Sequence, residues 1–192
     1  MNDFYFYFRL GWEHIISWDA TDHLLFILAL SAIYLVQNSK QLLILVTAFT
    51  VGHSLTLALS VYELVQVSSK WVEFLIPVTI MATGLFNLLQ KNREPSTLQL
   101  NYLLALLFGL IHGLGFANNI RFMLASAQKI AIPLFGFNVG LEAGQILVVC
   151  VILLTSFLFV NRLKVQRKWW VTSVSVFAII MASYMAFTRL PF

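Results

Sequence analysis

Histidine and carboxylate side chains occur where the sequence is otherwise apolar. The chain has four histidines, each within or beside a hydrophobic run, and three carboxylates in comparable positions. Ionisable groups at membrane depth are costly, so they usually face the interior of a helix bundle and serve a function. Imidazole and carboxylate are good ligands for divalent Zn, Ni, Co or Mn, which predicts one metal site. The predicted ligands are His14, Asp22, His23, His53, Glu73, His112 and Glu142.

A hydrogen-bonded network without metal is the alternative interpretation of these residues. A single histidine in a membrane often only bonds a neighbouring helix, and His–Asp or His–Glu pairs would satisfy one another. Lipid, however, offers no water to solvate an unpaired charge, and a metal ion would satisfy the whole set. We therefore favour bound Ni, Co or Zn, and the sequence leaves open which metal binds and how many ions.

The composition indicates an integral membrane protein. Of the 192 residues, 60% are hydrophobic and only 10% are charged, whereas soluble domains carry about 25% charged residues. The mean hydropathy of +0.86 agrees. The net charge of +4 comes from Lys and Arg residues scattered between apolar segments, as at a membrane surface, so we expect no nucleic-acid partner. Cys150 is the only cysteine, which excludes a disulfide framework and a cysteine-based metal site.

The apolar segments predict an all-α polytopic membrane bundle of about six transmembrane helices. A span needs about 20 mainly apolar residues, so six spans with short loops use nearly all of residues 1–192 as a single domain. A short aromatic segment, residues 4–17, precedes the spans and is predicted to lie at the membrane interface. The predicted spans are residues 21–37, 41–65, 71–90, 98–117, 134–160 and 169–187.

The alternating direction of the spans predicts that the ligands meet in one half of the membrane. Asp22 and His23 begin the first span, Glu73 begins the third and His112 lies near the end of the fourth, all on the side of both termini. The densest short basic run is the loop at residues 161–168, which predicts that both termini lie outside the cytoplasm. The expected partners are a metal ion and the lipid bilayer, and homo-oligomer formation stays open.

Four further polar residues share a helix face with a predicted ligand or lie close to one in the sequence, so we expect them to orient the ligands. They are Asp19, Thr50, Asn138 and Gln145. Thr50, for example, lies on the same helix face as His53 and could orient its imidazole. Gly136, Gly140 and Gly144 form a stripe of small residues, which predicts close helix packing.

Five strings carry the predicted ligands: HIISWDATDHLLFILAL, TAFTVGHSLTLALS, WVEFLIPVTI, FGLIHGLGFA and FNVGLEAGQ. Together they resemble the HupE/UreJ family, in particular its second, shorter branch of small bacterial membrane proteins, over residues 10–149. The resemblance implies a nickel or cobalt permease of the inner membrane that supplies hydrogenase and urease. It implies that Glu142 falls in the glycine-rich acidic motif of the fifth span and that the other predicted ligands match motif positions. Two features differ from the hydrogenase-linked members of the family. The spacing from His14 to Asp22 is longer than in their HxxxxxDH motif. Those members also have a glutamate shortly after the fourth-span histidine, whereas no glutamate closely follows His112 here, so Glu142 would act in its place.

Transport and catalysis are both compatible with such a pocket. A permease would capture a cation there and pass it inward, although the inner half offers only poor ligands such as Asn87, Thr155 and Ser156. An intramembrane zinc-dependent metalloenzyme, acting as a hydrolase, would hold Zn with three histidines and use Glu73 or Asp22 as general base. A metal-binding accessory or sensor subunit is a third option. The family resemblance ranks transport first.

Overall fold

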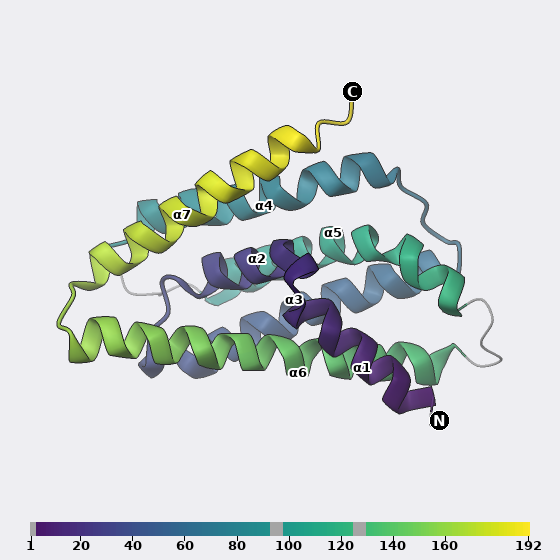
Figure 1. Ribbon diagram of the computed structural model, residues 1–192, viewed down its shortest axis with the longest axis horizontal. Helices are drawn as coiled ribbons and strands as arrows, with labels where there is room; N and C mark the ends of the chain where they lie inside the picture. Colours follow the sequence, from purple (N-terminus) through teal and green to yellow (C-terminus); the bar gives the residue numbers. More distant parts are fainter. Residues whose placement is uncertain (1–2, 93–97, 125–129) are drawn as a thin grey trace.

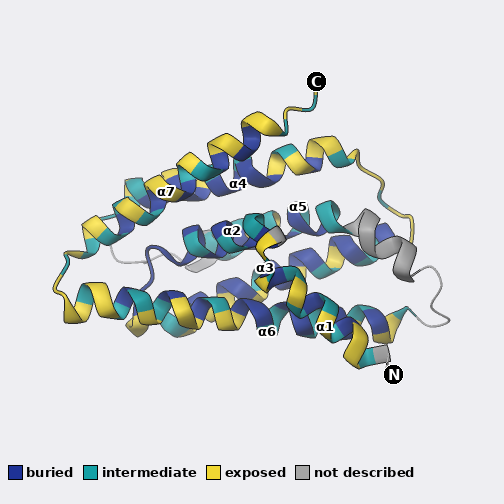
Figure 2. Cartoon of the chain, viewed as in Figure 1, coloured by how far each residue is buried: buried dark blue, intermediate teal, exposed yellow. Residues whose placement is uncertain are grey.

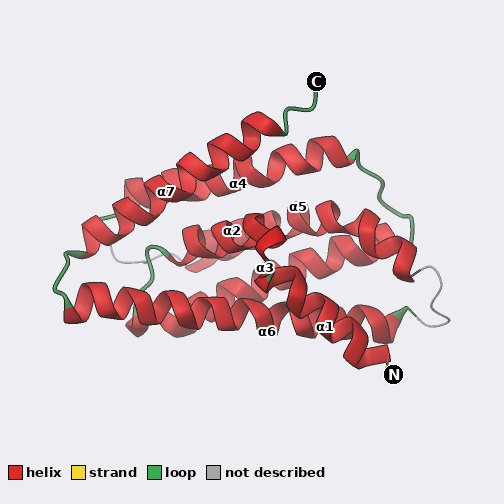
Figure 3. Ribbon diagram, viewed as in Figure 1, coloured by secondary structure: helices red, strands yellow, loops and turns green. Residues whose placement is uncertain are grey.

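The computed structural model describes residues 3–92, 98–124 and 130–192, without the side chains of residues 3, 19, 98–100 and 117–124. Every regular element in these ranges is a helix (Figure 3), which confirms the predicted all-α class. The elements are α1 (Asp3–Ile16), η1 (Trp18–Ala20), α2 (Thr21–Ser31), η2 (Val36–Asn38), α3 (Ser39–Val61), α4 (Ser69–Gln90), α5 (Leu98–Leu124), α6 (Ala131–Ser156), the π-helical η3 (Phe157–Arg162) and α7 (Arg167–Thr188).

Four helical segments in the described ranges are long and apolar enough to cross a membrane. They are Val36–Val61, Ser69–Gln90, Ala131–Arg162 and Arg167–Thr188, with 22 to 32 residues each. At 1.5 Å per residue, even the shortest spans about 33 Å, enough for the hydrocarbon layer. Each of them has residues that are exposed (yellow in Figure 2), and many of these residues are apolar, as contact with lipid requires. The chain is therefore a multi-pass membrane protein, as predicted.

The first predicted span, residues 21–37, is α-helical only as far as Ser31. The chain then turns: the Ala32 amide bonds the Ala29 carbonyl and the Tyr34 amide bonds the Ser31 carbonyl, at 3.2 and 3.0 Å. Because the turn is itself apolar and buried, hydropathy could not separate it from the helix. The resulting α2 has 11 residues and is too short to span a bilayer alone.

The N-terminal segment predicted at the interface is the helix α1, and it packs lengthwise against α6 (Figure 1). The two backbones touch: a Cβ atom added to Gly140 would collide with the Phe8 carbonyl oxygen, and one added to Gly11 would collide with that of Phe137. The predicted glycine stripe is thus a packing device. It holds α1 against the bundle, and α1, η1 and α2 follow one another along the chain as an interrupted helix.

A second close pair, α3 and α5, forms the other side of the core. A Cβ atom on Gly109 of α5 would collide with the Phe49 carbonyl oxygen of α3, and one on Gly52 would collide with that of Leu106. This backbone contact brings the middle of α3 against the middle of α5. Helix α4 packs against α7 and completes the bundle around α2.

Candidate metal centre

The four histidines come from four different helices and meet inside the bundle. His14 lies in the last turn of α1 and His23 in the first turn of α2. His53 and His112 face them from the centres of α3 and α5, and neither side chain has any exposed surface. His14, His23 and His53 each present one ring nitrogen, and these three atoms lie within 4.8 Å of one another. The centre of the His112 ring is 5.3 Å from that of His23. The predicted convergence of the histidines is therefore present.

Most of the imidazole nitrogens have no hydrogen-bond partner within the described part of the chain. Five such atoms are buried: Nε2 of His14, Nε2 of His23, Nδ1 and Nε2 of His53, and Nδ1 of His112. Buried polar side-chain atoms are normally hydrogen-bonded, so this concentration is unusual. A closed hydrogen-bonded network would have paired these nitrogens with each other or with carboxylates. The orphaned nitrogens instead fit the donor set of a metal site, which uses neutral imidazole lone pairs.

The Thr79 hydroxyl group determines which ring nitrogen of His112 carries the proton. Thr79 donates its hydroxyl proton to the Ile76 carbonyl oxygen at 2.7 Å. Its oxygen lies 3.3 Å from Nε2 of His112 and can then only accept, so Nε2 carries the ring proton. The lone pair of His112 is thereby left on Nδ1, which has no partner among the described residues. Such orientation by a neighbouring group is typical of metal-binding histidines.

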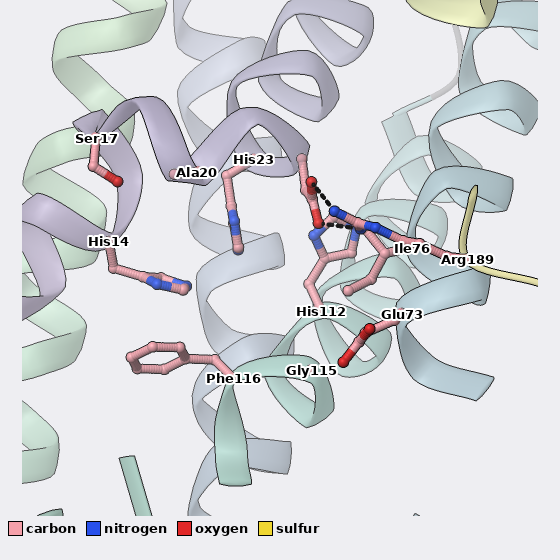
Figure 4. Close-up of a pocket in the computed structure, with 11 residues that line it drawn as sticks. His14, Ser17, Ala20, His23, Glu73, Ile76, His112, Gly115, Phe116 and Arg189 are labelled. Atoms are coloured by element: carbon pink, nitrogen blue, oxygen red, sulfur yellow. Dashed lines mark hydrogen bonds and ion pairs between the residues drawn. The ribbon is translucent and has the colours of Figure 1, made fainter. Parts of the chain in front are cut away.

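The histidine cluster opens into a cavity of about 320 Å³ (Figure 4). Its polar lining combines three of the histidines with two carboxylates and a guanidinium: His14, His23, His112, Asp22, Glu73 and Arg189. The Glu73 side chain is exposed and forms no ion pair with another described residue. Asp22, by contrast, accepts two hydrogen bonds from Arg189, at 2.7 and 3.2 Å. The cavity thus holds one ion pair, Asp22–Arg189, and one further carboxylate, Glu73, together with the imidazoles.

Aromatic rings pack against the histidine cluster, and one of them, Phe116, also lines the cavity. The Phe116 ring centre lies 3.9 Å from that of His14, and the Phe137 ring is stacked on His53 with centres 6.3 Å apart. Phe49 lies against both His53 and His112. These rings exclude water and restrict the imidazoles. Because the surroundings have a low dielectric constant, a bound cation would interact strongly with its ligands there.

Not every predicted residue lies at this cavity. Glu142 is absent from its lining and accepts a hydrogen bond of 2.6 Å from Thr47. The Thr50 hydroxyl donates to Gln145 Oε1 at 2.7 Å, and neither ring nitrogen of His53 has a hydrogen-bond partner in the described part of the chain. The side-chain oxygen of Asn138 is buried without a partner in the described part of the chain. The side chain of Asp19 lies outside the described residues.

Sequence reasoning missed three residues of the site: Thr79, Phe116 and Arg189. Thr79 and Phe116 lie in apolar spans and carry no signal of their own. Arg189 did have a signal in the sequence. It follows the last apolar span and lies on the same predicted side of the membrane as Asp22, so their opposite charges indicate a possible ion pair.

The family model described as HupE / UreJ protein matches residues 1–189. The match extends beyond the strings that carry the histidines and includes α7 and Arg189. A comparison with curated proteins and a comparison with solved structures each find no match.

Proposed function

Because this chain belongs to the HupE/UreJ family, we propose that it is a membrane permease for a divalent ion of the nickel or cobalt type and binds its cargo at the histidine cluster. The observation that carries the proposal is the set of three imidazole nitrogens within 4.8 Å of one another, at the core of a multi-pass bundle. The family is related to nickel and cobalt, and nitrogen ligands suit both ions.

The spacing of the nitrogens is close to what a transition metal needs. Metal–nitrogen bonds of about 2.0–2.1 Å place two ligand atoms of a tetrahedral ion about 3.4 Å apart. The observed limit of 4.8 Å is somewhat wider, so small rotations of His14, His23 and His53 close the site around an ion. His112 lies beside His23 and supplies a fourth nitrogen or a relay position.

The carboxylates attract the ion toward the histidine cluster. Asp22 and Glu73 line the same cavity as the histidines, and Glu73 stands at its exposed edge. Negative charge at the mouth of a low-dielectric cleft raises the local concentration of cations. We place this mouth on the extracytoplasmic side, where the sequence predicts both termini.

A line of polar side chains that leads along α4 away from His112 also supports transport, although the cavity beside it has a mainly apolar lining. Thr79, Thr83 and Asn87 lie one helical turn apart on the buried face of α4, and Thr79 contacts His112. Thr83 and Asn87 also line a second cavity of about 230 Å³ between α2, α4 and α5, together with Tyr34 and Asn101. Their oxygens offer weak, exchangeable contacts, which suit an ion that must leave.

One observation favours a second candidate, an intramembrane zinc hydrolase. The cavity places the exposed Glu73 carboxylate, which forms no ion pair with other described residues, beside a potential three-histidine site. Zinc held by three histidines lowers the pKa of bound water to about 7, and a carboxylate can serve as its base. Both candidates require bound metal, and only the permease requires flux.

The test measures binding and flux on the same preparations. The detergent-purified parent and the His23→Ala variant are loaded with Ni²⁺, Co²⁺ or Zn²⁺ and dialysed, and their metal content is measured. Each protein is then reconstituted into vesicles that contain a metal-sensitive dye, which reports influx. Ser183→Ala is the matched control, because its hydroxyl only bonds its own helix at Ile179. We expect metal and influx in the parent and control, and neither in His23→Ala. Bound metal without influx contradicts the permease and leaves the hydrolase; absence of metal contradicts both.

A further inference from the structure

Asp22 and Arg189 form a two-pronged ion pair at the edge of the histidine cavity. The two guanidinium nitrogens donate to the two carboxylate oxygens of Asp22 at 2.7 and 3.2 Å (Figure 4). The exposed fractions of the side chains are 31% for Arg189 and 17% for Asp22, so the pair is partly shielded from solvent. A planar fork of this kind is the strongest arrangement that a carboxylate and an arginine can make.

This pair occupies a carboxylate that a bound metal ion would also attract. Asp22 directly precedes His23, whose imidazole belongs to the three-histidine cluster, and both residues line the cavity. Both Asp22 oxygens already accept hydrogen bonds from Arg189, so an ion that binds Asp22 would share a carboxylate whose charge the guanidinium already neutralises. A divalent ion and a guanidinium at one carboxylate also repel each other.

We propose that Arg189 is a built-in counterion that competes with the incoming metal ion for Asp22, so that loading exchanges one cation for the other. The inference rests on the proposed metal site and adds a residue that sets its affinity. In the empty site, the guanidinium compensates a carboxylate that would be costly to leave alone. When an ion enters, Asp22 turns to the metal and Arg189 is released. Its return to Asp22 then helps to expel the ion.

A second carboxylate in the same cavity suits the released guanidinium. Glu73 lines the cavity together with Arg189 and forms no ion pair with another described residue. Glu73 belongs to α4, which packs against α7, the helix that Arg189 directly follows. The exchange therefore leaves neither the arginine nor the metal without an acidic partner.

The opposing interpretation is a clamp that only fastens the end of α7 to α2. The two interpretations predict different effects of removing Arg189 on the affinity for metal. If Arg189 competes with the metal, its removal strengthens metal binding. If Arg189 positions Asp22 for the metal, or merely holds the fold together, its removal weakens binding or leaves it unchanged.

The experiment measures the dissociation constants of Ni²⁺ and Co²⁺ by calorimetry on the detergent-purified full chain. We expect Arg189→Gln to bind about tenfold more tightly than the parent, within the usual range of coupling between two sites. Arg189→Lys keeps the positive charge but cannot form the two-pronged contact, so its metal affinity should increase by much less than that of Arg189→Gln. In the Asp22→Asn background, Arg189→Gln should change affinity by about twofold or less. Arg9→Gln is the matched control, because it removes a 2.7 Å bond to Glu13 away from the cavity.

The outcomes separate this inference from the function on which it rests. A parent that binds neither ion overturns both. A parent that binds metal while Arg189→Gln binds no tighter overturns the competition alone, and an equal gain in the Asp22→Asn background shows simple charge repulsion instead. If Arg189→Gln elutes as an aggregate, the Arg189→Lys variant tests the proposal instead. A metal affinity of Arg189→Lys that is equal to or weaker than that of the parent contradicts the proposal.

Discussion

The ring centres of His14 and His23 lie 4.5 Å apart although the two residues belong to different helices. In one continuous helix, residues nine positions apart point to opposite faces and are separated by about 13 Å along the axis. The interruption at Ser17–Ala20, which contains η1, removes that separation. The site is therefore built by a helix break, and the break's length decides whether the imidazoles meet.

Insertion of one alanine after Ser17 should lower metal affinity at least tenfold, because it rotates α1 against α2 and parts His14 from His23. Titration of the purified variant with Ni²⁺ measures the effect. The same insertion after Gln66, in the connection between α3 and α4, is the control and should bind like the parent. Unchanged affinity after insertion at Ser17 would falsify the role of the break.

Thr79→Val should weaken metal binding about tenfold, because valine keeps the volume but removes the acceptor that holds the proton on Nε2 of His112. Loss of a group that orients a ligand typically costs 10- to 100-fold in affinity. Thr155→Val is the matched control, since that hydroxyl bonds only the Val151 carbonyl of its own helix. Equal affinity of both variants would mean that His112 is not oriented by Thr79.

Thr83→Val should reduce vesicle influx severalfold while metal binding to the purified protein stays within about twofold of the parent. Thr83 lines the second cavity and donates to the Thr79 carbonyl oxygen at 2.9 Å, outside the histidine cluster. Influx of Co²⁺ and its equilibrium binding are measured on one preparation. If influx persists at the parental rate, the ion takes another way out of the bundle.

Gly140→Ala should destabilise the protein by about 1–3 kcal/mol, as overpacking does. The new methyl group would collide with the Phe8 backbone carbonyl, which cannot move without shifting α1. In Gly84→Ala, the nearest atom at 2.7 Å belongs to the flexible Ile179 side chain, so this control should cost much less. Thermal unfolding in detergent compares the two, and equal melting temperatures would contradict tight α1–α6 packing.

The sequence predicts the convergence of the histidines because alternating spans return to the same side of the membrane. It also predicts close helix approach from the glycine stripe at residues 136–144, which the contact with Phe8 confirms. The position of Glu142 could not be predicted in this way. Its helix face was identified correctly, since Glu142 and Gln145 both point to α3. Which partner that face meets depends on the rotation of α6 in the fold, and in the structure Glu142 meets Thr47.

The end of α2 and the role of Arg189 also needed the structure. An apolar turn after Ser31 has the same hydropathy as a helix, so composition alone extended the span to residue 37. Arg189 resembles an ordinary basic residue at a membrane surface until the fold brings the end of α7 to the start of α2.

The backbone contacts at the glycines divide the bundle into parts that can and cannot move. Where a helix carbonyl sits against a glycine, as between Phe8 and Gly140 or Phe49 and Gly109, sliding or rolling would cause a clash, so each of these helix pairs moves as a rigid body. The imidazoles stand on or between these rigid pairs, whereas Glu73 stands on α4, which meets α7 through the side chain of Ile179. We therefore expect a change in the size of the cavity to come from movement of α4 and α7 relative to the helices that carry the histidines.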